Sequence, residues 1–404
     1  MRSLTLTPNT FQTLSLAALE ENLALYDWSK IRFLESTENL KSIIHQSTER
    51  TPSTTVARDI AACLQQGRIF FEIAEGAPLQ VKPLQIYYGM VGFAKAIILA
   101  RQVSSSIATL AQSHGLSEIS DQNAKIEDMT LQFHANGLFT EFNDTVASLG
   151  RIVYYDERGS FQQIAKPFDM SASLANSRCT LKDVLARIPK LERAYERTFG
   201  ELPACWYIEL DYRQAVVQLQ LRVPTTFTDR DDLCRLVQAW RAKFPFLDGW
   251  CFTQATRAWD ESVLTFNNWE KPADGDFSPE YLIQSGDDFG PRRNSPPKLR
   301  PFETLLPALA GGITVEHTRA IQPVNGVILS EFALHFCAAF ILSSLVRYRP
   351  QIWQHALSHS AFENRPTDDR ALSLIEKLLE IALIEFPNLV EKAIDRQNSH
   401  DMRV

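Results

Sequence analysis

The chain has 404 residues, of which 45% are hydrophobic and 22% are charged, as is ordinary for globular proteins. Its formal net charge of −7 excludes a global positive field for nucleic acid and leaves room only for a local basic pocket. The length predicts two or three domains, or one domain with a large insertion.

The cysteines and the N-terminus favour a cytoplasmic protein. The six cysteines form no CxxC pair, and no histidine cluster stands at zinc spacing, so we expect no metal and no cofactor. Most of them lie in apolar runs, which is typical of buried thiols in a reducing compartment. The N-terminus has no long apolar segment, so no signal peptide is expected. Polar residues interrupt the apolar stretch 327–346, which predicts a buried helix and no membrane span.

The first third of the chain predicts helices. Residues 16–27 and 31–46 carry apolar residues at steps of three and four, and residues 51–55 offer caps for a further helix. The segment "PLQIYYGMVGFAKAIILAR" opens at Pro83 and contains Gly89 and Gly92, each of which costs about 1 kcal/mol in an exposed helix. Close approach of another helix would compensate, so this segment is expected to be a core helix.

The middle of the chain changes its hydrophobic period. Residues 151–166 and 205–223 each alternate across a turn and predict hairpins, residues 229–244 predict an amphipathic helix, and residues 248–268 predict two more strands. Residues 270–301 are rich in Pro, Gly, Asp and Ser, which favours a long solvated loop with one short strand at 281–284. Together these elements indicate an antiparallel sheet with a helix on one face.

The chain then returns to helices, at 327–346, 350–358, 368–386 and 387–397. We therefore predict an α+β protein that is predominantly α-helical. Its N-terminal part (1–150) and C-terminal part (321–404) form one bundle, and an α+β module (151–320) is inserted between them. The helix that contains Tyr87 and Tyr88 should lie against 327–346.

Two segments together resemble the YaaC-like family of bacterial proteins. The family pattern pairs a Pro-Leu-x-x-Tyr-Tyr-Gly helix, followed by His-Gly-Leu, with a C-terminal Arg-Tyr-x-Pro-x-x-Trp. The order and rough separation match here, over most of the chain, at Pro83, Leu84, Tyr87, Tyr88, Gly89, His114, Gly115, Leu116, Arg347, Tyr348, Pro350 and Trp353. The resemblance implies no particular activity.

The C-terminal segment is also similar to HEPN-type helical domains, some of which are metal-independent ribonucleases with an Arg-x(4–6)-His motif at a helix start. Arg349 and His355 fit that spacing, although Pro350 stands where a polar residue is typical. The similarity implies that His355 acts as a base, that Arg349 or Arg347 clamps phosphate, and that two copies meet in a dimer. The structural alternative is that Arg347 satisfies helix-terminal carbonyls and His355 is merely exposed.

A second candidate site is a ligand pocket. Tyr88 and Lys95 stand seven residues apart on one helix, so both can face one pocket with Arg347. The alternative is a packed tyrosine with a lysine that reaches to water. Further along, His114 with Gly115 predicts a helix end with a left-handed glycine. Glu331 and His335 stand four residues apart on the apolar helix, and a buried Glu331 would need a structural partner such as Arg347 or a tyrosine.

Three functions follow. The first is an interaction or scaffold protein that works through a protein partner or as a homodimer, with a defence or toxin–antitoxin setting implied only by the HEPN-type similarity. The second is a ribonuclease with RNA as its partner. The third is a small-molecule or nucleotide sensor. The sequence contains no Gly-rich phosphate loop with a following Lys, no GxSxG and no HExxH, which argues against nucleotide hydrolases of the P-loop class, serine hydrolases and metalloproteases.

Overall fold

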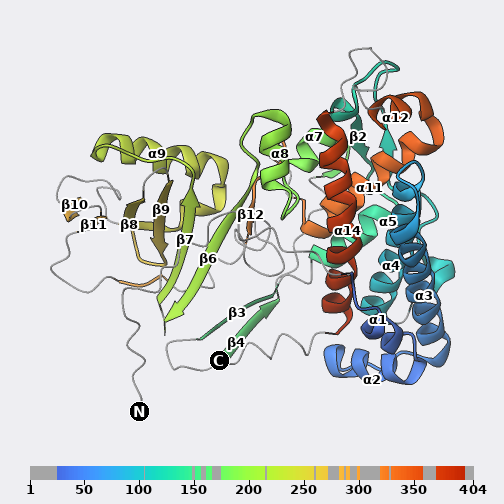
Figure 1. Cartoon of the computed structure of the whole chain (residues 1–404). Coiled ribbons are helices and arrows are strands. Elements are labelled where there is room, and N and C mark those ends of the chain that lie inside the picture. The colour runs from blue at the N-terminus through green and yellow to red at the C-terminus, as the bar shows by residue number, and fades with distance from the viewer. Residues whose placement is uncertain are drawn as a thin grey trace.

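The computed structural model describes residues 25–103, 105–147, 151–155, 161–165, 174–213, 216–258, 261–271, 282–285, 288–291, 298–300, 319–326, 329–357 and 370–395. Most of the helices gather on one side of the molecule, and a twisted sheet with one long helix over it forms the other side (Figure 1). This arrangement confirms the predicted α+β class with a predominance of helix.

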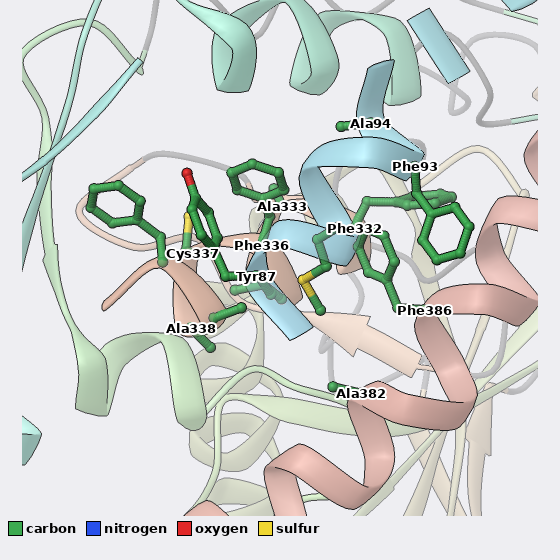
Figure 2. Packing of buried hydrophobic residues seen from close by; sticks show 14 of the residues in the cluster. Tyr87, Phe93, Ala94, Phe332, Ala333, Phe336, Cys337, Ala338, Ala382 and Phe386 are labelled. Atoms are coloured by element: carbon green, nitrogen blue, oxygen red, sulfur yellow. The ribbon is translucent and has the colours of Figure 1, made fainter. Parts of the chain in front are cut away.

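The helical side combines helices from the N-terminal and the C-terminal parts of the described chain. Its N-terminal helices are α1 (Ser29–Leu34), α2 (Thr37–Thr48), α3 (Thr54–Gly76), α4 (Lys82–Gln102) and α5 (Leu138–Ala147). Its C-terminal helices are α11 (Glu331–Tyr348), α12 (Pro350–Leu357) and α14 (Arg370–Ile394). The predicted contact is confirmed, because the Tyr87 ring on α4 lies 5.5 Å from Phe336 and 5.6 Å from Phe340 on α11. Figure 2 shows these helices meeting around Tyr87.

Helices α4 and α11 are buried on nearly every side. Apolar residues surround both helices rather than forming one stripe, which is typical of a helix in the centre of a core. By length and composition both helices could cross a membrane, but 72% and 83% of their apolar windows are buried inside the fold. A buried position explains this composition, since core helices of folded domains carry the same apolar character.

Three glycines allow α3 and α4 to cross closely. A Cβ atom on Gly92 would stand 2.9 Å from the backbone nitrogen of Gly67 and 3.0 Å from the carbonyl oxygen of Cys63. One on Gly89 would collide with the ring of Phe71. The close helix approach expected from these glycines is therefore confirmed, and it explains why the core helix keeps them.

We expect Gly92→Ala to lower the free energy of unfolding by about 2 kcal/mol, because the backbone of α3 must shift to admit the methyl group. Chemical denaturation of the two proteins measures the difference. Gly76→Ala is the matched control, since Gly76 ends α3 and a Cβ there would meet no atom within 4 Å. Equal losses in both variants would contradict the close crossing.

The sheet side is a seven-stranded sheet, antiparallel at every pairing. In spatial order its strands are β10 (Leu282–Ser285), β11 (Asp288–Pro291), β8 (Cys251–Ala258), β9 (Glu261–Asn267), β7 (Val216–Val223), β6 (Cys205–Arg213) and β12 (Arg319–Ile321). Helix α9 (Arg230–Lys243) covers one face, where Trp240 and its neighbours build a second hydrophobic core. The predicted hairpin at 205–223, the helix and the strand pair at 248–268 are confirmed.

Smaller elements complete the structure. Strands β1 (Leu116–Glu118), β2 (Thr130–Phe133) and β5 (Arg178–Thr180) form one small sheet, and β3 (Arg151–Tyr155) pairs with β4 (Phe161–Ala165) as the predicted hairpin. Helices α7 (Leu181–Leu185) and α8 (Glu192–Phe199) follow. The buried side chains between 174 and 205 belong to the core of the helical side, and the second core begins beyond Cys205. The domain boundaries at 151 and 320 stay predictions.

Two helix predictions were wrong. The single helix expected at 31–46 is broken between Leu34 and Thr37, because Ser36 adopts an extended conformation and starts α2. The break expected at Pro387 is absent, and α14 runs through it. A proline removes one helix hydrogen bond, but the buried face continues on both sides at Phe386 and Val390, so packing outweighs the loss.

Two loop predictions also need correction. The lone strand at 281–284 is one arm of a hairpin, since β10 pairs with β11. Gly115 has a left-handed φ of +76°, as expected, but it precedes β1 and does not end a helix. Its backbone lies against Gly137, and a Cβ there would crowd that residue.

The helix expected at 16–27 lies mostly outside the described residues, and residues 25–27 are not helical.

Candidate functional site

A groove with a volume of about 800 Å³ opens where α11 ends and α12 begins. One wall comes from these two helices, and the other comes from the segment around β1. The lining is mostly polar and consists of His114, Ser117, Glu118, Gln122, Asn123, Phe340, Ser344, Arg347, Tyr348, Arg349, Pro350, Gln351 and Ile352. The groove therefore joins the two segments that carry the family resemblance.

Arg347 stands in this groove as a half-buried cation. Its Nε donates to the carbonyl oxygen of Ser343 at 3.2 Å, and its guanidinium carbon lies 5.8, 5.9 and 4.9 Å from the rings of Tyr87, Tyr88 and Tyr348. Within the described ranges, Arg347 forms no ion pair. The aromatic faces hold the guanidinium in place without neutralising its charge. The structure thus brings together Arg347 and Tyr88, two of the predicted ligand-binding residues.

His114 adds a neutral donor beside this cation. The hydroxyl of the buried Tyr87 lies 2.7 Å from His114 Nδ1. Burial, and then the charges of Arg347 and Lys95, lower the pKa of His114, while burial raises the pKa of Tyr87. The tyrosine therefore keeps its proton and donates it to Nδ1, which assigns the remaining ring proton to Nε2. Lys95, the third predicted ligand residue, is half-buried and close enough for His114 to sense its charge.

The predicted catalytic pair, Arg349 and His355, is not brought together in the groove, because Arg349 lines it and His355 does not. Arg349 forms an ion pair with Glu118 at 2.9 Å, and its Nη atoms donate to the carbonyl oxygens of Asp121 at 2.9 Å and Ser120 at 2.8 Å. His355 lies one and a half turns into α12, its side chain is exposed, and it takes part in at least one interaction with another residue. Arg349 is thus held by four hydrogen bonds to the β1 segment. Its proposed catalytic role stays a prediction.

The start of α12 also faces the groove. Pro350 is its first residue and has no N–H, and Gln351 and Ile352 follow in the first turn, where N–H groups have no helical carbonyl partner. Trp353 fixes this turn, since its Nε1 donates to the carbonyl oxygen of Gln80 at 3.0 Å. Such a helix start favours a negative charge.

Several lining residues were not predicted from the sequence. Gln122, Asn123 and Gln351 have common polar side chains whose pattern carries no signal, and Glu118 becomes relevant only through its distant partner Arg349. The part of the chain that the structure describes contains no group of three or more His, Cys, Asp or Glu residues placed to hold a metal ion. All six cysteines are free thiols.

The fold and the groove define a class of protein: its helical core combines N-terminal and C-terminal helices of the described chain, a sheet is inserted between them in the sequence, and a polar groove lies beside a half-buried arginine. The chain belongs to the YaaC-like protein family, whose model matches residues 27–394. No curated protein and no solved structure matches the chain. The family assignment covers both the helical side and the inserted sheet. The HEPN-type similarity stays a prediction.

Proposed function

We propose that this protein binds a small anionic ligand in the groove and works as a sensor or binding protein. One observation carries the proposal: Arg347 is a half-buried cation that lines the groove, and it has no carboxylate partner in the described chain. Burying an arginine without a counter-ion is costly, and an anionic ligand would supply that counter-ion.

The surroundings of Arg347 support the same ligand class. His114 offers a neutral N–H donor, Ser344 offers a hydroxyl, and the first turn of α12 offers unpaired N–H groups. The carboxylate of Glu118 also lines the groove, but Arg349 already neutralises it. Donors therefore outnumber free negative charges, which is the composition expected of an anion site.

A cytoplasmic setting and a protein partner or second copy remain part of the proposal. The six free cysteines support a reducing compartment. A ligand-dependent interaction would join the sensor and scaffold functions in one protein. The ribonuclease alternative has less support, because Arg349 has little capacity left for phosphate.

The test is the binding of an anion panel to wild type and to Arg347→Gln, measured by calorimetry and thermal shift. The panel contains inorganic phosphate, pyrophosphate, citrate and nucleoside phosphates. We expect the tightest of these to bind roughly 10- to 100-fold more weakly to the variant, which is the loss expected for a charged hydrogen-bond donor. Arg58→Gln is the control, since Arg58 is an exposed arginine on α3 outside the groove lining.

Two outcomes would overturn the proposal. One is equal affinity of wild type and Arg347→Gln for every anion, and the other is no binding at millimolar concentrations. Cleavage of RNA in EDTA that is lost in His355→Ala would support the ribonuclease function in its place.

A further inference from the structure

We propose that the ligand of the groove is a nucleoside phosphate, whose phosphate contacts Arg347 and whose base stacks on Tyr348. This inference rests on the proposed anion-binding function and specifies its ligand. It is drawn from three features of the groove: an exposed ring beside the cation, uncharged amide side chains along the wall, and the size of the hollow.

The ring of Tyr348 is placed for stacking. It is the last residue of α11, lines the groove, and is 70% exposed, the highest exposure of any large aromatic side chain in the described chain. The guanidinium of Arg347 lies over one face of this ring, 4.9 Å from the ring centre, so a base would stack on the opposite face. Aromatic rings open to solvent at a ligand site offer a stacking face to any nucleobase.

The amides of Gln122, Asn123 and Gln351 lie along the same groove, and all three side chains are exposed. Each amide presents an N–H donor and a carbonyl acceptor, which matches the alternating donors and acceptors on the edge of a base. Together the three amides offer both donors and acceptors to a bound base.

Size and charge favour a free nucleotide over a long nucleic acid. The volume of about 800 Å³ lies within the range of small-molecule sites. The chain carries a net charge of −7, so a polyanion would meet repulsion outside the groove. The shared chemistry is a nucleoside phosphate, whether it is free or at the end of an RNA strand.

The experiment measures the affinities of nucleoside mono- and diphosphates with each of the four bases. Ribose 5-phosphate, inorganic phosphate, pyrophosphate, an unphosphorylated nucleoside and a short 5′-phosphorylated RNA are the comparison ligands. We expect at least one nucleoside phosphate to bind about tenfold more tightly than ribose 5-phosphate. Binding of the RNA at equal affinity would identify an RNA end as the source of the ligand.

Variants of Tyr348 separate stacking from other effects. Tyr348→Ala should weaken nucleoside phosphate binding about tenfold more than it weakens phosphate binding, and Tyr348→Phe should restore nucleoside phosphate binding. Tyr207→Ala is a matched control, because Tyr207 is also an exposed tyrosine (41%) beside an arginine, Arg319 at 5.1 Å, but lies on β6.

The outcomes distinguish the two proposals. If phosphate, pyrophosphate or citrate binds through Arg347 as tightly as the nucleotides do, or if Tyr348→Ala binds nucleotides like wild type, the nucleotide inference fails and the anion site stands. If no ligand depends on Arg347, both fail.

Discussion

Arg349→Ala is expected to lower the free energy of unfolding by about 3 kcal/mol, the largest single-residue effect that we predict at neutral pH. The Glu118 side chain is 9% exposed and the Arg349 side chain 21% exposed, so the carboxylate would be left in a largely dry site without its partner. The same change would also remove the donors to the carbonyl oxygens of Ser120 and Asp121.

Urea denaturation followed by circular dichroism measures this loss. Arg32→Ala is the control, because Arg32 pairs with Glu72 at the surface, where its side chain is 60% exposed and Glu72 keeps Arg68 as a partner. The control should lose less than about 1 kcal/mol. A loss in Arg349→Ala no larger than in the control would show that the ion pair does not stabilise the fold, and would return Arg349 to the candidates for phosphate binding.

His335 should make the stability depend on pH in the acid range. The residue is fully buried on α11, its ring lies 6.4 Å from that of Phe386, and neither ring nitrogen has a hydrogen-bond partner in the described structure. Burial lowers the pKa of His335 from 6.5 to about 4. The unfolded chain therefore takes up the proton first as the pH falls, and stability is complete above pH 6.5 and decreases toward pH 4.

At pH 4.5 this one group should cost roughly 2.5 kcal/mol relative to pH 7. His335→Leu removes the titrating group and keeps a side chain of similar size. Between pH 7 and pH 4.5 the variant should therefore lose roughly 2.5 kcal/mol less free energy of unfolding than wild type. Denaturation curves at pH 7, 5.5 and 4.5 give the difference, and His45→Leu, at an exposed histidine of α2, is the control. Parallel pH profiles of wild type and His335→Leu would contradict the prediction.

Local patterns in the sequence were enough to predict most elements of the fold. Alternation identified the hairpin of β6 and β7, and the apolar surroundings of Tyr87 identified α4 as a core helix. The break at Ser36 and the continuity at Pro387 were not predictable in this way. Both depend on how a buried face packs against distant helices, and local propensity is too weak to decide against such packing.

The candidate site was predictable in part for a related reason. Arg347 and Tyr88 carry an unusual combination of charge and aromatic character, so each could be selected on its own. The partner of Arg349 could not, because Glu118 is an ordinary acidic residue that stands 231 positions earlier in the chain. A contact of this length leaves no periodic trace in one sequence, and it decides whether an arginine is free for a ligand.

The separation of 231 positions between Glu118 and Arg349 also has a consequence while the ribosome synthesises the chain. A ribosome that adds about 5–20 residues per second needs roughly 10–50 s to travel from Glu118 to Arg349. During that time α4 has emerged but α11, which covers it, has not, whereas the second core, within 206–320, can close on itself first. Newly made chains therefore carry a bare apolar helix beside a folded sheet, and a chain that stops before α11 is a substrate for chaperones and proteases.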